Sequence, residues 1–267
     1  MIGIFDSGLG GLTILKSLLR ELPSYDYIYL GDIARVPYGS RSFDTIYSYT
    51  LEAVDFLFKK GCKLIILACN TASAAALRKI QQEYLPVKYP DLRVLGVLIP
   101  AAEEAAKMSK NGKIGVIGTE ATVKSETLKY ELIKQNSNLK VYQSACPLLV
   151  PIIEAGEMRW IGLDLILKKY LKPLKEKNVD TLVLGCTHYS VIKKEIAKVM
   201  GSKVKIVSED DIIGFKLKNY LSRHPEMEKK LSKKRKRYYF TTSYSQNFTK
   251  VANIFLKMEA DFNIVKL

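Results

Sequence analysis

The sequence is short of the residues that bind metals. Its 267 residues include two histidines and four cysteines: His188, His224, Cys62, Cys69, Cys146 and Cys186. No two cysteines are spaced as CxxC, and a tetrahedral zinc site needs clustered Cys or His ligands. We therefore expect no structural zinc. The chain is also much longer than the small disulfide-stapled scaffolds, so we expect its thiols to be reduced.

Long apolar runs are missing as well. No stretch reaches the roughly 18 to 20 apolar residues that cross a bilayer, and the sequence starts with MIGIFDSG, without a basic segment. We expect a soluble, unexported protein in the cytoplasm, with no membrane partner. A hydrophobic content of 48% suffices to build the core of one large domain or two domains of ordinary size.

Acidic residues are fewer than basic ones, which gives a net charge of +15. Clustered positive charge binds polyanions without sequence preference, but most Lys and Arg residues here are scattered over expected helix faces. One dense run, KKLSKKRKR, extends from Lys229 to Arg237. A solvated helix end or loop is the simpler interpretation of this run. A surface that binds nucleic acid or a membrane is the alternative.

Short β-rich runs alternate with helical patterns along the chain. The first half predicts strands at 2–8, 25–32, 64–69 and 92–98 and helices at 12–21, 44–60 and from 72 onward. From Lys113 the order restarts, with predicted strands at 113–119, 139–147, 180–186 and 203–209 and helices at 123–135 and 163–177. Strands that alternate with helices form parallel sheets with right-handed crossovers.

The repeated order of elements indicates a duplication. We predict an α/β fold of two similar, doubly wound parallel-sheet domains related by a pseudo-two-fold axis, with the active site in the cleft between them. The last segment predicts a strand at 237–243 and a helix from Ser245 to about Met258, and we expect it to complete the first domain. The predicted domains are therefore residues 1–97 plus 209–267, and residues 98–208.

Two strands end in a cysteine, in LIILACNTAS and in DTLVLGCTHYS, and the two phrases align on Cys69 and Cys186. Each cysteine precedes an expected helix start, where the helix dipole lowers a thiol pKa towards neutrality. Two thiols on opposite sides of one cleft can remove a proton from one face of a carbon and return one to the other. Such inversion needs one thiolate and one thiol. Cys62 and Cys146 lack this pattern, and we interpret both as structural.

Polar clusters follow five predicted strands: DSGLGG (6–11), GDIARVPYG (31–39), CNTAS (69–73), GTEATVKS (118–125) and CTHYS (186–190). Ligands of open parallel sheets bind at these strand ends, near helix N-termini. The glycines of DSGLGG have neither GxGxxG nor P-loop spacing, which argues against a nucleotide cofactor. They can instead permit a tight turn from strand to helix.

Seven motifs occur in order along nearly the whole chain: GIFDSGLGGLTIL, GDIARVPYG, ACNTASA, GVLIPAA, IGVIGTEATVKS, ACPLLVPIIEAGE and TLVLGCTHYSVI. With them the chain resembles the glutamate racemases of the aspartate/glutamate racemase superfamily. The resemblance implies interconversion of L- and D-glutamate without pyridoxal phosphate, metal or other cofactor, which supplies D-glutamate for peptidoglycan. It also implies a homodimer. Some glutamate racemases inhibit DNA gyrase, which makes gyrase a further candidate partner of the basic run at 229–237.

The resemblance implies roles for individual residues. In this family the cysteine matched by Cys69 acts on the D-enantiomer and the one matched by Cys186 acts on the L-enantiomer. Asp6, His188 and Glu154 are expected to assist the thiols as further catalytic residues. The implied substrate-binding residues are Asp6, Ser7, Pro37, Tyr38, Gly39, Asn70, Thr71, Thr119, Thr187 and His188. Ser190 departs from the family, which usually has proline there, but this change removes no chemical group.

Plainer interpretations and rival functions stay open. His188 can be a hydrogen-bonded core residue, and Glu154 can be a solvated residue at a helix start. The chain can be an aspartate or hydantoin racemase, with the same cysteine pair in a differently shaped pocket. It can also be a binding protein with a vestigial cleft and a basic tail that recruits nucleic acid. A panel of amino-acid substrates separates the racemases, and the intact cysteine pair argues against a pure binding role.

Overall fold

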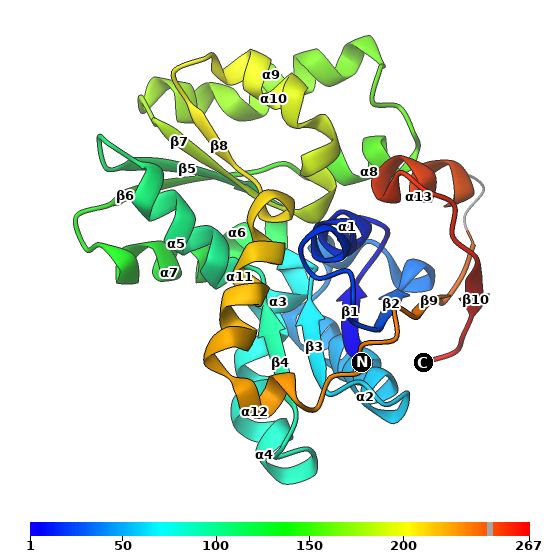
Figure 1. The fold of residues 1–267 in the computed structure, drawn as a ribbon. Coiled ribbons are helices and arrows are strands. Elements are labelled where there is room, and N and C mark those ends of the chain that lie inside the picture. The colour runs from blue at the N-terminus through cyan, green and yellow to red at the C-terminus, as the bar shows by residue number, and fades with distance from the viewer. Residues whose placement is uncertain (245–247) are drawn as a thin grey trace.

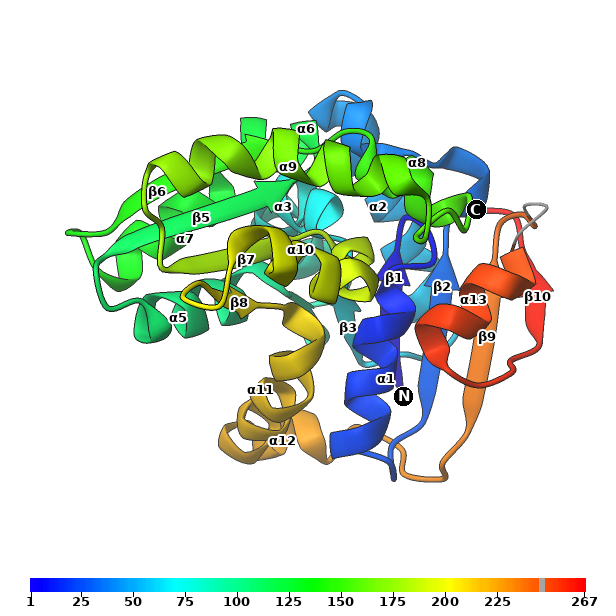
Figure 2. The ribbon, with the colours of Figure 1, turned by 90° about the horizontal axis from the view of Figure 1, so that it is seen from above.

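The computed structural model describes residues 1–244 and 248–267. These residues form two parallel sheets flanked by helices (Figures 1 and 2). The first sheet has the strand order β10-β9-β2-β1-β3-β4, and the second has the order β6-β5-β7-β8. Without β10 and β9, the first order is β2-β1-β3-β4 and the second is β6-β5-β7-β8. The four strands of each half are therefore arranged in the same order. The predicted α/β fold with two similar parallel sheets is therefore confirmed.

The strands have the following bounds. The first sheet contains β1 (Ile2–Asp6), β2 (Tyr27–Gly31), β3 (Leu64–Leu67), β4 (Arg93–Gly96), β9 (Arg237–Thr241) and β10 (Phe262–Ile264). The second sheet contains β5 (Lys113–Gly118), β6 (Lys140–Ala145), β7 (Thr181–Gly185) and β8 (Lys205–Val207).

The helices connect these strands. The α-helices are α1 (Gly11–Glu21), α2 (Phe43–Lys59), α3 (Asn70–Lys79), α4 (Leu85–Lys88), α5 (Leu98–Met108), α6 (Glu120–Lys124), α7 (Thr127–Gln135), α8 (Leu149–Glu154), α9 (Ile161–Glu176), α10 (Lys193–Met200), α11 (Glu209–Arg223), α12 (Pro225–Glu228) and α13 (Phe248–Leu256). Short 3₁₀ segments are η1 (Ile33–Arg35), η2 (Tyr38–Ser40) and η4 (Thr187–Ile192), and η3 (Ile80–Tyr84) is a π-helical turn.

The central strands are continuous apolar runs because helices cover both faces of each sheet. β1, β3 and β7 are buried along their whole length. In the first sheet Ile2 pairs with Tyr27 on one side and Leu64 on the other, and in the second Ile114 pairs with Val141 and Thr181. Since all strands are parallel, the polar residues after them emerge at a single edge of each sheet.

Helix α1 joins the two halves of the molecule. It packs against α11 and α13 and also contacts η4, which follows the second cysteine strand. Apolar residues at Leu12, Leu15 and Leu18 recur at helical spacing and are buried. They belong to an apolar cluster that continues into α9 and β7. The segments that follow β1 and β7 are thereby held against each other.

The structure differs from the predicted elements at several points. The helix after Cys69 starts at Asn70, and the segment after Cys186 is the 3₁₀ segment η4, not the start of an α-helix. Within η4 the Ser190 hydroxyl donates to the Thr187 carbonyl and so competes with an α-helical pattern. Strand β10 was not predicted. Of the predicted helix from Ser245, residues 245–247 lie outside the described residues, and α13 covers most of the rest.

The C-terminal segment returns to the first sheet, where β9 pairs with β2 and β10 pairs with β9. On this basis we propose a discontinuous first domain of residues 1–97 plus 209–267 and a second domain of residues 98–208. Among the described helices, none is long and apolar enough to cross a membrane.

Candidate active site

A pocket of about 100 Å³ lies where the carboxyl ends of the two sheets face each other, and this volume holds several waters or one small molecule. Residues of both halves line it: Ser7, Val36, Pro37, Tyr38, Gly39, Ser40, Cys69, Asn70, Thr71, Thr119, Glu120, Pro147, Val150, Pro151, Cys186, Thr187 and His188. Of the predicted site residues, only Asp6 and Glu154 are not in this lining. Both contact residues that are, as described below.

Some lining residues were not singled out from the sequence: Val36, Ser40, Glu120, Pro147, Val150 and Pro151. All but Ser40 lie inside the quoted motifs, so a signal for them existed. Four of them are valines or prolines, and the other two, Ser40 and Glu120, directly follow the predicted site residues Gly39 and Thr119. Apart from Pro37 and Gly39, the predicted set consists of residues with polar or thiol side chains, so most of the apolar part of the wall was passed over.

Cys69 occupies the N-cap of α3, directly after β3. Its Sγ accepts a hydrogen bond from the Ala72 amide at 3.5 Å and lies 3.3 Å from the Ser7 hydroxyl. Burial raises the pKa of Cys69 to about 12, and the nearby charge of Asp6 adds to this, while both hydrogen bonds oppose it. The predicted lowering of this pKa is therefore wrong, because loss of solvent outweighs the helix terminus. Cys69 is a neutral thiol in the free protein.

Cys186 follows β7 and stands beside a histidine and an acid. Its Sγ lies 3.8 Å from Nδ1 of His188, and Nε2 of His188 lies 3.0 Å from Oε1 of Glu154. Burial alone lowers the pKa of His188, but the contacts with Cys186 and Glu154 reverse this and leave the pKa well above its ordinary value. Glu154 is the last residue of α8, not a solvated residue at a helix start. His188 is buried but bridges two ionisable groups, unlike a plain core histidine.

Asp6 connects the two halves below the pocket lining. Its Oδ2 accepts from the Gly8 amide at 2.9 Å, and its Oδ1 accepts from the Thr187 hydroxyl at 3.2 Å. The side chain is fully buried, and burial raises its pKa, while the charge of His188 and these hydrogen bonds act in the opposite direction. This carboxyl group therefore keeps its proton to higher pH than an exposed aspartate does.

The glycines of DSGLGG permit close contact between the halves. A Cβ on Gly10 would lie 2.3 Å from Thr187 Oγ1 and 2.6 Å from His188 Nδ1, and a Cβ on Gly8 would lie 2.7 Å from Glu154 Oε1. Gly10 itself has ordinary helical angles, with φ of −57° and ψ of −36°. The lack of a side chain, not a special backbone conformation, is what this position requires.

Three threonine hydroxyls gather where Thr71 and Thr119 line the pocket. Thr71 Oγ1 lies 2.9 Å from Thr119 Oγ1 and 3.3 Å from Thr122 Oγ1. Thr119 also caps α6 by accepting from the Thr122 amide at 3.2 Å. Gly39 approaches this cluster so closely that a Cβ on it would lie 2.7 Å from Thr119 Cβ. Hydroxyls and a helix N-terminus together suit a carboxylate.

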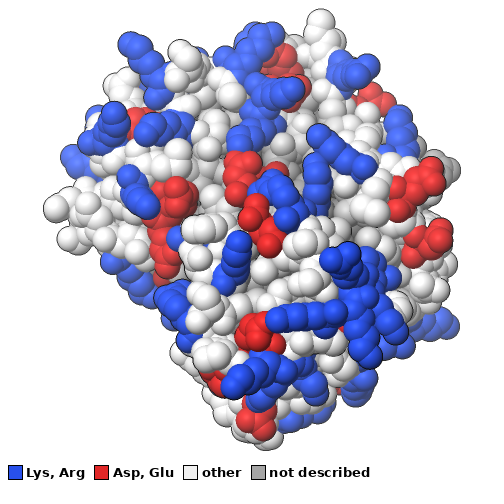
Figure 3. All heavy atoms as spheres, viewed as in Figure 1, with Lys and Arg blue, Asp and Glu red and all other residues white. Residues whose placement is uncertain are grey.

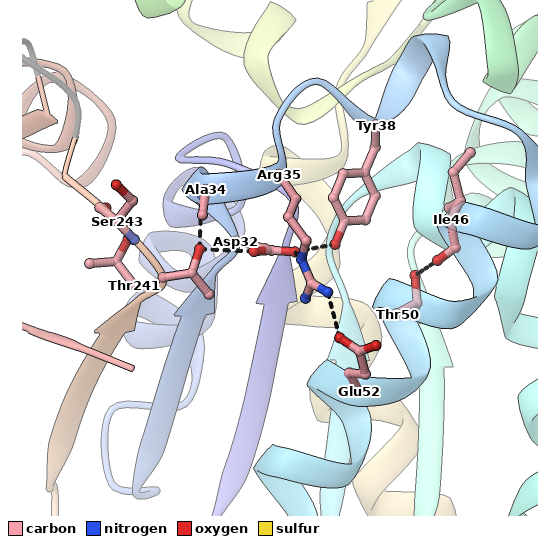
Figure 4. Close-up of polar contacts among 10 residues, drawn as sticks. Asp32, Ala34, Arg35, Tyr38, Ile46, Thr50, Glu52, Thr241 and Ser243 are labelled. Atoms are coloured by element: carbon pink, nitrogen blue, oxygen red, sulfur yellow. Dashed lines mark hydrogen bonds and ion pairs between the residues drawn. The ribbon is translucent and has the colours of Figure 1, made fainter. Parts of the chain in front are cut away.

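Asp32, which was not singled out from the sequence, holds the loop containing Tyr38. Its Oδ2 accepts from the Tyr38 hydroxyl at 2.5 Å and from Arg35 Nε at 2.6 Å, as Figure 4 shows. Its Oδ1 accepts from the Thr242 hydroxyl at 2.8 Å, and Arg35 also pairs with Glu52 of α2. The C-terminal segment thus helps to fix the loop that lines the pocket.

The two remaining cysteines do not line the pocket. Cys62 and Cys146 are buried, and burial raises the pKa of each to about 12. Cys146 donates weakly to the Ser144 carbonyl at 3.7 Å. In the described part of the chain, no three His, Cys, Asp or Glu side chains gather in a way that can hold a metal ion.

The paired strand-end cysteines and the surrounding motifs agree with a comparison to known families. The family described as Asp/Glu/Hydantoin racemase matches residues 2–209 of the chain. The chain belongs to this racemase family. A similar member is the glutamate racemase of Geobacter metallireducens, which is 41% identical over 255 residues, or 96% of this chain and 92% of that protein.

Solved structures of the family extend the similarity to the whole fold. Glutamate racemase isoform RacE1 from Bacillus anthracis has a TM-score of 0.91 at 34% identity, covering 100% of this chain and 97% of that one. Glutamate racemase from Francisella tularensis, in complex with D-glutamate, has a TM-score of 0.89 at 35% identity, covering 99% and 97%. The likeness to these racemases therefore includes the C-terminal segment beyond residue 209.

Proposed function

We propose that this member of the family is a glutamate racemase, which interconverts L- and D-glutamate through two cysteines and without a cofactor. The observation that carries the proposal is that Cys69 and Cys186 follow corresponding strands of the two sheets and line the same pocket. A substrate α-carbon between them has one sulfur on each side. Removal of a proton by one sulfur and delivery of a proton by the other inverts the configuration.

The two sulfurs have different surroundings, which suits their need for opposite protonation states. Burial keeps Cys69 as the thiol. Cys186 stands beside His188, whose raised pKa favours the protonated imidazole. A cation next to a sulfur stabilises a thiolate. If the family's assignment of the two cysteines applies, removal of a proton by Cys186 and delivery of a proton by Cys69 converts L-glutamate to D-glutamate.

The polar lining provides for the charge that develops during the reaction. Loss of the α-proton places negative charge on the α-carbon and its carboxylate, and prearranged donors lower the energy of that state. We propose that the donors are the side chain of Asn70, the hydroxyls and the backbone N–H groups that line the pocket. The hydroxyl donors are Ser7, Thr71, Thr119 and Thr187. Asp6, His188 and Glu154 are proposed to set the proton state of the sulfurs.

The decisive experiment follows deuterium incorporation at the α-carbon of L- and D-glutamate in D₂O, with circular dichroism recorded in parallel. We expect the wild type to exchange and racemise both enantiomers without an added cofactor, and Cys69→Ala and Cys186→Ala to lose racemisation. Cys62→Ala is the control, since it removes a buried thiol that takes no part in the proposed reaction. Racemisation that survives in either of the first two variants contradicts the two-cysteine scheme.

The same assay separates the rival functions. If glutamate does not exchange but aspartate or a hydantoin does, the chain is a racemase of the family with another substrate. If no compound exchanges, the binding-protein interpretation replaces the enzyme. We propose further that the enzyme supplies D-glutamate for peptidoglycan in the bacterial cytoplasm and that it is a homodimer. Light scattering on the purified chain measures the oligomeric state.

The basic run at 229–237 supports a separate proposal, that of binding to nucleic acid or DNA gyrase. Figure 3 shows Lys and Arg residues spread over the face in view, with acidic residues among them. Part of the run serves the fold: Lys233 pairs with Glu228, and Arg237 donates to the Tyr25 carbonyl. Neutralising Lys234, Arg235 and Lys236 should weaken such binding in a salt-dependent way. Unchanged binding counts against this proposal.

A further inference from the structure

Glu209 is a buried acid that the two-cysteine scheme does not use. It is the first residue of α11 and is 2% exposed. Its Oε2 accepts a hydrogen bond from Asn70 Nδ2 at 2.9 Å. Asn70 is equally buried, lines the pocket and directly follows Cys69. A contact across 139 residues of sequence therefore reaches a side chain proposed to bind the substrate.

Two further atoms of this pair are unsatisfied. In residues 1–244 and 248–267, neither Glu209 Oε1 nor Asn70 Oδ1 has a hydrogen-bond partner. Both are acceptors when the acid is ionised, so they cannot bond to each other in that state. The protonated acid can donate from Oε1 to the amide oxygen while it accepts from the amide nitrogen. One proton on Glu209 can thus satisfy both atoms at once.

The surrounding charges favour that proton. Burial raises the pKa of Glu209 well above its ordinary value, and the charges of Asp210 and Asp6 raise it further, whereas the hydrogen bond from Asn70 acts in the opposite direction. A neutral acid also suits the proposed ligand, because an ionised Glu209 would repel a substrate carboxylate bound by Asn70.

We propose, on the basis of the proposed racemase function, that Glu209 is a positioning residue whose carboxyl group fixes the Asn70 amide and leaves its second Nδ2 hydrogen for a substrate carboxylate. Without this contact the amide can turn over and present its oxygen, which repels a carboxylate. Since Asn70 adjoins Cys69 in the chain, the same contact sets the place of the α-carbon relative to that sulfur.

Steady-state racemisation by Glu209 variants tests the inference. Glu209→Ala should lower kcat/KM on the order of 10- to 100-fold, the effect of an unpaired buried polar group. Part of the loss should appear in kcat, because the α-carboxylate gains negative charge in the transition state. Glu209→Gln should recover most of the loss, because a second amide also offers one donor and one acceptor. Glu209→Met keeps the length without the hydrogen bonds and replaces Glu209→Ala if that variant does not fold.

A double-mutant comparison distinguishes positioning from a general role in packing α11. If Glu209 acts through Asn70, Asn70→Ala and the double variant Asn70→Ala/Glu209→Ala should have the same kcat/KM, within about 2-fold. A packing role predicts an added loss in both backgrounds. Asp211→Ala is the control, because Asp211 is an exposed residue of the same helix that pairs with Lys193 at the surface. Its kcat/KM should equal that of the wild type.

The outcomes separate the two proposals. A wild type that does not racemise glutamate overturns both the proposed function and the role of Glu209. A racemising wild type together with a fully active Glu209→Ala, or with a double variant less active than Asn70→Ala, overturns the role of Glu209 alone. Coupled losses with rescue by Glu209→Gln support it.

Discussion

Adding one methyl group to Gly10 tests the geometry of the whole site. A Cβ there would lie 2.3 Å from Thr187 Oγ1, whereas ordinary contacts begin at 3.4 Å. One of the two must therefore move by about 1.1 Å, the difference between these distances. Thr187 has little freedom to move because it is buried and its hydroxyl donates to Asp6. The second close neighbour, His188, is buried between Cys186 and Glu154.

We expect Gly10→Ala to lower kcat/KM about 100-fold, since a displacement of about 1 Å near the reacting groups has an effect of this size. Overpacking should also lower the free energy of unfolding by roughly 1 to 3 kcal/mol. The backbone adds no penalty, because the angles of Gly10 are those of an ordinary helix. Racemisation followed by circular dichroism gives kcat/KM, and urea unfolding gives the stability.

Gly201→Ala is the matched control. Gly201 has φ of +92° and has no atom within 4 Å of an added Cβ, so alanine strains the backbone without touching a neighbour. This variant should lose about 1 to 3 kcal/mol of stability and keep its kcat/KM. Wild-type kcat/KM in Gly10→Ala would refute the described contact between the glycine loop and the residues after Cys186.

The ionisable and buried polar groups around the pocket lead to three further expectations. Glu154→Gln removes one of the contacts that raise the pKa of His188, so the alkaline fall of kcat/KM should move to lower pH; an unchanged pH profile contradicts this role. Burial raises the folded-state pKa of Asp6 above its unfolded value, so the protein gains stability as pH falls through the window between the two. Asp6→Asn should make the dependence of unfolding free energy on pH shallower in that window, and an identical slope argues against a raised pKa. Asp32→Ala should lower the unfolding free energy by about 1 to 3 kcal/mol and raise KM. Tyr38→Phe should have a smaller effect, because it removes only one of the hydrogen-bond donors to Asp32. Equal effects of the two variants would contradict the described hydrogen bonds of Asp32.

The sequence predicted the features that depend on neighbouring residues. Apolar runs of strand length, alternating with amphipathic segments, indicated a doubled parallel α/β fold, because burial of both sheet faces leaves that pattern in the chain. The sequence also identified Cys69, Cys186 and the polar residues of the motifs around them, for a similar reason. In parallel sheets all strands end at the same edge, so a residue that ends a strand is placed by local information.

Only the tertiary structure decided which of these residues touch and what their environment is. Thr187 meets Asp6 across 181 residues, Thr242 meets Asp32 across 210, and Glu209 meets Asn70 across 139. No periodic pattern records such pairs, because they depend on how two sheets and a returning C-terminal segment pack together. The pKa of Cys69 illustrates the same limit. Its place at a helix start is visible in the sequence and favours a lower value, but the loss of solvent that raises it arises only when the folded chain buries the thiol.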